Sequence, residues 1–176
     1  MHKPIPDLIA PVQAAAQNKH YRCTVPQRNF SRLMGILYET EGDAPVEIDL
    51  RFFVEPESGL PAFRLRFKSD YPLQCQRTLD TFSYPVEDEL QGVFVYEEGA
   101  EKLVPEHYDI WPLETASVKP WALIEDELML AVPIVPKKPG SPRVWLDRQE
   151  DEPAEEATQN NPFGVLKALK NKPENQ

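Results

Sequence analysis

The side chains that could do chemistry are few in this sequence, and its cysteines and histidines are the first to consider. The two cysteines, Cys23 and Cys75, lie far apart, and the three histidines are scattered. Zinc sites usually take cysteines in closely spaced pairs, but the residue that would complete such a pair with Cys75 is Thr78. We therefore expect no metal and no cofactor. The sequence favours a structural Cys75 at a strand end, although a nucleophilic thiol served by a distant histidine stays open.

Three consecutive acidic residues, Glu125, Asp126 and Glu127, are the other candidate ligands. Successive side chains of a helix diverge by about 100°, so these three cannot converge on one ion. We interpret them as an exposed acidic face. The sequence also has no phosphate-binding glycine loop, no G-x-S-x-G and no H-E-x-x-H motif. These absences favour a binding protein and not an enzyme.

The charge of the chain is unevenly distributed. The net charge of −10 argues against non-specific binding to nucleic acid. Residues 1–38, however, carry a balance of +4, whereas residues 39–144 carry −11. The basic segment is either ordinary solvated surface or a small patch that faces phosphates. The candidate contacts with RNA or the ribosome are the basic residues at its end and one in a later turn: Lys19, Arg22, Arg28, Arg32 and Arg77.

Short elements are expected near the N-terminus. Residues 11–19 start with proline and contain three alanines, which predicts a short helix. Residues 20–25 alternate as a short strand would, with Cys23 as a small buried residue. Residues 27–37 then place apolar side chains at helical spacing.

The strongest pattern is a pair of alternating segments, 46–54 and 62–69, separated by a loop rich in proline and glycine. This pattern predicts a β-hairpin. If Leu50 faces Leu65, Asp49 lies opposite Arg66, and such opposite charges stabilise a sheet. The basic row of the second strand, Arg64, Arg66 and Lys68, then serves either in cross-strand pairs with Asp49 and Glu47 or as a strip that faces RNA.

The later elements complete an α+β fold. Residues 76–80 should form a turn or bulge, and 82–86 and 92–98 should be further strands. Residues 117–136 predict a helix with Pro120 in its first turn and Pro133 at its end. We expect an antiparallel meander of about five strands, short helices near the N-terminus and one longer helix after the sheet.

The domain organisation follows from a change in composition. Residues 1–142 should form one α+β domain, residues 143–159 an acidic flexible linker, and residues 160–176 a short helical motif. Four residues of that motif are candidates for docking onto a partner, by the spacing of helix-in-groove recognition: Phe163, Leu166, Leu169 and Lys170. No apolar run is long enough to span a bilayer and no secretory signal is apparent, so we expect a cytoplasmic protein.

Three segments, taken in order, resemble a known family. LQCQRTLDTFSYPV, ALIEDELMLAVPIVP and NPFGVLKALK are similar to the YceD family of large-ribosomal-RNA-accumulation proteins. The resemblance implies a role in the synthesis, processing or stability of 23S rRNA. Many members read C-x-R-C where this chain reads CQRT, so metal binding by such relatives is not carried over. The residues that match the family pattern are Cys75, Arg77, Glu125, Asp126 and Glu127, with Arg77 expected to be exposed in its turn.

Three functions are compatible with the sequence to different degrees. The first is a non-catalytic factor that binds a pre-large-subunit particle or 23S rRNA through the basic residues. The second is an acidic adaptor or chaperone for a basic ribosomal protein or an RNA-processing enzyme, docked through the C-terminal helix. The third, a ribonuclease or other enzyme, is disfavoured by the missing motifs.

Overall fold

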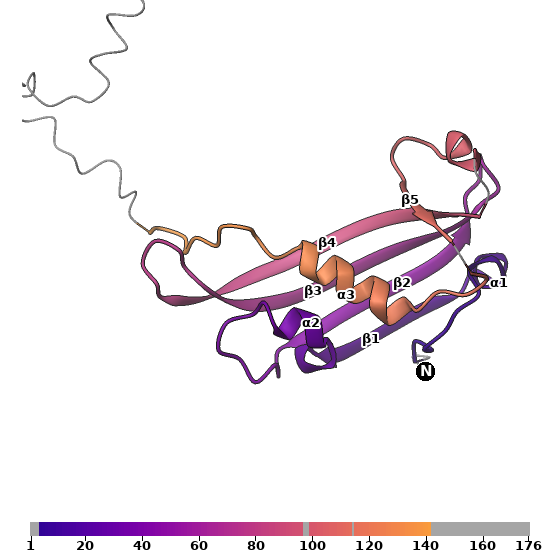
Figure 1. The fold of residues 1–176 in the computed structure, drawn as a ribbon. Coiled ribbons are helices and arrows are strands. Elements are labelled where there is room, and N and C mark those ends of the chain that lie inside the picture. Colours follow the sequence, from indigo (N-terminus) through magenta and orange to yellow (C-terminus); the bar gives the residue numbers. More distant parts are fainter. Residues whose placement is uncertain (1–3, 97–98, 114, 142–176) are drawn as a thin grey trace, which may run out of the picture. The chain divides into compact units, whose positions relative to one another are not determined.

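A single five-stranded sheet is the centre of the fold in the computed structural model, which describes residues 4–96, 99–113 and 115–141. The strands follow one another across the sheet in chain order (Figure 1). Their bounds are β1 His20–Pro26, β2 Pro45–Val54, β3 Pro61–Gln74, β4 Thr81–Val95 and β5 Asp109–Pro112. Neighbours from β1 to β4 pair antiparallel, and β5 is parallel to β4. The predicted α+β fold is therefore confirmed.

Short helices cover one face of this sheet. Their bounds are α1 Pro11–Ala16, α2 Ser31–Met34 and α3 Pro120–Leu130. There are also two 3₁₀ turns, Gln27–Asn29 and Ala100–Leu103, and Ala100 of the second packs on a small cluster of the opposite face. Figure 1 shows α3 lying across the sheet with α2 beside it. Ala14 of α1, Leu33 of α2 and Ile124 of α3 all join the same buried cluster as the strands. The three α-helices thus bury their apolar residues against one side of the sheet.

The strand alternation decides which side that is. In β2 and β3 every second residue is buried, and the inward set includes Val46, Ile48, Leu50, Phe52, Phe63, Leu65, Phe67, Tyr71 and Leu73. The side chains between them point to the opposite face and are charged over most of its length. The predicted register is confirmed, with Leu50 opposite Leu65 and Asp49 opposite Arg66.

The turn between β2 and β3 holds this register. The carboxylate of Glu55 is buried and accepts hydrogen bonds from the Ser58 hydroxyl (2.6 Å) and from the backbone N–H groups of Glu57 and Ser58. The Ser58 hydroxyl is the main reason that the pKa of Glu55 is lowered. Gly59 then takes a positive φ of 71°, which glycine adopts without strain.

Two expected elements differ from the structure. β4 is one continuous strand where two, 82–86 and 92–98, were expected. The inward positions of both halves are even-numbered, so the alternation passes unbroken through the charged residues Glu87–Glu89, which hide it. The fifth strand of the sheet is β5, a segment that was not expected to be a strand. The helix expected over 27–37 is shorter in the structure, where only α2 is α-helical. The predicted turn at 76–80 is present, and the predicted segments 143–159 and 160–176 lie outside the described residues.

The segment before α1 closes the fold against the residues that lead into α3. Ile9 and Val118 form an isolated antiparallel bridge, with hydrogen bonds of 2.9 and 2.8 Å in the two directions. At the other end of α3, the buried hydroxyl of Tyr71 donates a 2.9 Å hydrogen bond to the carbonyl of Leu128. Carbonyls in the last turn of a helix have no partner within the helix, so Tyr71 supplies one from the sheet.

Replacing Tyr71 with Phe should lower the stability of the protein. The change leaves the buried Leu128 carbonyl without its donor, at a cost of about 1–2 kcal/mol, and the thermal midpoint should fall by several degrees. Tyr84→Phe is the matched control, since Tyr84 points to the same face and its hydroxyl makes no hydrogen bond with the described residues. Equal midpoints for the two variants would show that the Tyr71 hydrogen bond does not hold α3.

Candidate nucleic-acid interface

The face of the sheet opposite the helices carries rows of charged side chains. Its basic members come from β1, β2 and β3, and its acidic members from β2 and β4. The basic side chains are His20, Arg22, Arg51, Arg64, Arg66 and Lys68, and the acidic ones include Glu47, Asp49, Glu87 and Glu89. The side chains of Arg22, Arg66 and Lys68 are 60%, 61% and 61% exposed. This face is therefore accessible to a partner.

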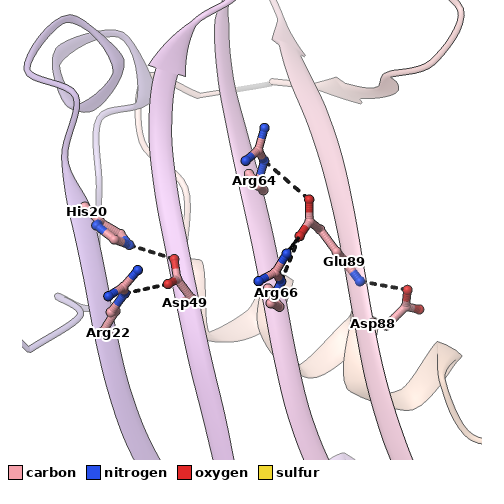
Figure 2. Close-up of polar contacts among 7 residues, drawn as sticks. All are labelled: His20, Arg22, Asp49, Arg64, Arg66, Asp88 and Glu89. Carbon is pink, nitrogen blue, oxygen red and sulfur yellow. Dashed lines mark hydrogen bonds and ion pairs between the residues drawn. The ribbon is translucent and has the colours of Figure 1, made fainter.

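A shallow depression of about 150 Å³ lies where the arginines are densest, and we call it the arginine basin. It is lined by His20, Arg22, Asp49, Arg51, Arg64, Arg66 and Glu89, most of which Figure 2 shows. Asp49 accepts a 2.5 Å hydrogen bond from Arg22 Nε, and its other oxygen lies 2.7 Å from His20 Nε2. Burial raises the pKa of Asp49, but the hydrogen bonds to His20 and Arg22 outweigh it, so the pKa is lowered.

Glu89 of β4 serves the other side of the basin. It accepts a 2.8 Å hydrogen bond from Arg66 Nε, and Arg64 Nε lies 3.5 Å from it. The expected pairs between β2 and β3 are thus wrong, although their register is right. A residue of β3 has a neighbour on each side, and Asp49 is already bonded from β1. Arg66 and Lys68 turn instead to Glu89 and Glu87 of β4.

Arg51 is the exception among the basic side chains of the basin. It lies opposite His20 on β1 and opposite Arg64 on β3. Its guanidinium makes no ion pair or side-chain hydrogen bond within the described ranges, whereas Arg22, Arg64 and Arg66 each face a carboxylate. Like charges opposite one another destabilise a sheet. With four arginines against two carboxylates, the basin is net positive on a chain whose net charge is −10.

An aromatic side chain borders the basin. Arg51, Phe53 and Arg64 line a second depression of about 180 Å³. Phe53 is half-buried, and its ring centroid lies 6.4 Å from that of Tyr108. Arg51 and Phe53 were not among the site residues expected from the sequence. Both share the parity of Glu47 and Asp49, so the same alternation that placed those residues outward could have placed these two.

The other expected contacts lie elsewhere on the structure. Arg28 pairs with Asp43, and Lys19 is half-buried just before β1. Arg77 is half-buried, not exposed as expected, and its Nη1 donates a 3.2 Å hydrogen bond to the carbonyl of Ser141. Of the five expected RNA contacts only Arg22 lies in the basin. Contact by the other four stays a prediction, which competes with the basin as the RNA-binding surface.

Arg32 joins α2 to the acidic residues of α3. Its backbone N–H and its Nε donate 2.7 and 3.0 Å hydrogen bonds to Glu125, and its Nη1 donates a 2.6 Å bond to Asp126. The Glu125 side chain is only 13% exposed, and Glu127 is half-buried, with a pKa raised by burial and by nearby acidic residues. The exposed acidic face expected here holds for Asp126, whose side chain is 49% exposed. It is wrong for Glu125 and Glu127, which are partly buried, and Glu125 turns inward to hold α2 on α3.

The turn that begins at Cys75 is fastened to the segment after α3. The Cys75 side chain is buried, and its Sγ accepts a hydrogen bond from the Lys138 N–H at 3.3 Å. Gln76 N–H donates a 3.0 Å hydrogen bond to the Pro136 carbonyl. The pKa of the Cys75 thiol is lowered to about 6, with Thr78 as the largest cause, the Lys138 N–H next and burial opposing both. Two of the segments that resemble a known family thus meet at this turn, through the hydrogen bond from Gln76 to Pro136.

Two kinds of feature are missing from the described ranges: clusters of metal ligands and helices that could span a membrane. Within residues 4–96, 99–113 and 115–141, no group of three histidine, cysteine or acidic side chains is placed to hold a metal ion. In the same ranges no helix has the length and apolar character needed to cross a membrane. The arginine basin is the arrangement on which a binding function can be built.

Cys75 should make the stability of the protein depend on pH. Its pKa is about 6 in the folded chain and ordinarily 9.0, so between these values the folded state binds fewer protons than the unfolded state. Stability should rise with pH across this window, and the contribution should be lost as the pH falls towards 6. Urea unfolding at several pH values should show a slope in the wild type that Cys75→Ser reduces. Cys23→Ser is the control, and an equal slope in all three proteins would contradict the ionised thiol.

The charge pairing on the sheet can be tested by double-mutant cycles. Asp49 and Arg22 should show a coupling energy of about 0.2–1 kcal/mol, the range for exposed ion pairs. Asp49 and Arg66 should show none, since each bonds to another residue. The measurement is the free energy of unfolding of each single and double alanine variant. Coupling of Asp49 to Arg66 alone would restore the pairing expected from the register.

Comparison with known proteins gives the chain a family. The family model described as "Large ribosomal RNA subunit accumulation protein YceD" matches residues 63–170. A protein of that name from Haemophilus influenzae is 28% identical over 175 residues, which cover 96% of this chain and 97% of the relative. No solved structure matches the chain. The matched range holds most of β3 together with β4, the Cys75 turn and α3, and it covers more than half of the sequence. The chain therefore belongs to the YceD family.

Proposed function

We propose that this protein is a non-catalytic cytoplasmic factor that supports the synthesis, processing or stability of 23S rRNA during assembly of the large ribosomal subunit. It does so by binding the rRNA of a pre-large-subunit particle with the arginine basin. The name of the family supports the biological role. The observation that carries the binding surface is the set of four arginines on the uncovered face of the sheet.

The charge distribution suits a selective RNA-binding protein. Phosphate contacts by arginine and lysine supply most of the affinity for nucleic acid, and their number sets its salt dependence. The net charge of −10 repels RNA from most of the surface and leaves the basin as the favourable contact. Such a protein binds RNA where its shape places the basin against phosphates, and binds poorly elsewhere.

The ion pairs of the basin do not prevent this use. Arg22 and Arg66 are 60% and 61% exposed, and exposed ion pairs contribute only about 0–1 kcal/mol. A phosphate can therefore replace or share a carboxylate partner at little cost. Arg28 is also exposed, but it lies outside the basin, and Arg32 bonds to two acidic residues and holds α2 on α3.

The adaptor function remains a second candidate, with one observation in its favour. The family match runs to residue 170 and so includes Phe163, Leu166, Leu169 and Lys170, the expected docking residues. These lie outside the described residues, so this proposal rests on sequence. Its test is a pull-down after RNase treatment. A protein partner that resists RNase and is lost on deletion of 160–176 would support it.

The RNA-binding proposal is tested with two double variants of equal charge. Arg22→Gln/Arg66→Gln removes two arginines of the basin, and Arg28→Gln/Lys102→Gln removes two cations outside it. The first should weaken binding of the full-length protein to pre-large-subunit particles and to 23S rRNA fragments about tenfold or more, because two phosphate contacts are lost. Each lost contact should also lower the slope of log affinity against log salt concentration by about 0.7–0.9. The second should change neither.

Sucrose-gradient co-sedimentation and binding titrations at several salt concentrations are the measurements. Thermal midpoints report whether each variant is folded. If the variant outside the basin loses binding and the basin variant keeps it, the contact lies in the basic N-terminal segment instead. If neither variant changes binding, the arginine basin is not the RNA-binding surface.

A further inference from the structure

The depression beside the basin brings together Arg51, which has no ion-pair partner among the described residues, and the aromatic ring of Phe53. Arg51 and Phe53 point to the same face of β2, two residues apart, and Arg64 lies directly opposite Arg51 on β3. Two residues along a strand span about 6.6 Å. Together the three side chains line a shallow depression of about 180 Å³.

The positive charges at this place are only partly balanced by carboxylates. Arg51 has His20 on one side and Arg64 on the other, and its guanidinium meets no carboxylate in the described part of the chain. Arg64 faces Glu89 only at 3.5 Å, with a shorter contact going to Arg66. An arginine fork is suited to bidentate binding of an oxyanion. The arrangement therefore favours an anion supplied from outside.

The aromatic ring of Phe53, next to these two arginines, is held in place by packing and is partly exposed to solvent. Phe53 packs against Tyr108, with ring centroids 6.4 Å apart, and against a second small cluster that includes Ala62, Val93 and Val95. It keeps part of its surface accessible because it is only half-buried. An aromatic side chain on an open sheet is the kind of platform on which an unpaired base stacks.

We propose that Arg51, Phe53 and Arg64 form a nucleotide seat for single-stranded RNA. Arg51 and Arg64 bind a backbone phosphate, and Phe53 stacks on the base of a neighbouring nucleotide. A base inside a duplex has both faces covered by its neighbours and cannot stack on a ring of the sheet, so the seat selects unpaired RNA. This inference rests on the proposed rRNA-binding function and specifies the form of RNA that the basin accepts.

The test compares two RNAs and four variants of the full-length protein. A single-stranded oligoribonucleotide with a 23S rRNA sequence, and the same strand annealed to its complement, are titrated with protein by fluorescence anisotropy. The variants are Phe53→Leu, which keeps an apolar contact with Tyr108, Phe53→Trp, which keeps a stacking face, Arg51→Gln, and the control Lys137→Gln, which removes an exposed cation that is not a candidate contact.

The wild type should bind the single strand more tightly than the duplex. Phe53→Leu should weaken single-strand binding by about 5–10-fold, the lower end of the range for base stacking because the ring is half-buried, with an unchanged salt slope. Phe53→Trp should bind the single strand about as tightly as the wild type does, because it keeps an aromatic ring at this position. Arg51→Gln should weaken single-strand binding and lower the salt slope by about 0.7, and Lys137→Gln should leave affinity and slope unchanged.

The outcomes separate this inference from the proposed function. If the wild type binds neither RNA, the proposed function fails and the inference fails with it. If it binds both RNAs equally, with Phe53→Leu neutral and Arg22→Gln/Arg66→Gln defective, the function stands and the seat is overturned. If Phe53→Leu does not fold, the fluorescence of the tryptophan in Phe53→Trp tests the proposal instead. Single-stranded RNA should quench the fluorescence of this variant more than that of the wild type, and equal quenching would overturn the proposed seat.

Discussion

The alternation of side chains along β2 and β3 constrains everything else in the molecule. One set of positions, including Leu50, Leu65 and Phe67, is buried, and all three α-helices pack on that side. No α-helix of the described residues covers the other side. At one end Ala100, Val104 and Tyr108 pack there on a small buried cluster, and over the rest of that side water is the neighbour and charged side chains are stable. A sheet built in this way has one face committed to the core and one face that is free to bind over most of its length.

The free face shows how charges distribute when each has several neighbours. Each position of β3 faces β2 on one side and β4 on the other, so a carboxylate on β2 competes with one on β4 for the same arginine. Glu89 serves two arginines, Asp49 serves β1, and Arg51 remains with none among the described residues. The unfavourable neighbourhood of Arg51 is tolerated because it is exposed to water, where like charges repel only weakly. A phosphate would remove even this cost.

The sequence alone predicts the part of this fold that depends on local periodicity. The register of 46–54 against 62–69 follows from two alternating runs, and the turn after Cys75 follows from a break in parity. The pairing of Arg66 does not follow, because it depends on β4, which the sequence pattern divides in two. The bonds from Arg32 to Glu125 do not follow either, since they join helices that only the completed sheet brings together. Arg51 and Phe53 were within reach of the same periodicity.

The bridge between Ile9 and Val118 has a consequence for how the chain is synthesised. Residue 118 leaves a translating ribosome roughly 5–20 s after residue 9, and α3, with Leu123, Ile124 and Leu128, follows it. Strands β1 to β4 are neighbours in sequence and can pair while translation continues. The apolar face of these strands stays partly exposed until α3 has been synthesised and packs on it. The nascent chain therefore passes through a stage in which a formed sheet exposes apolar side chains to solvent, the kind of surface that chaperones bind.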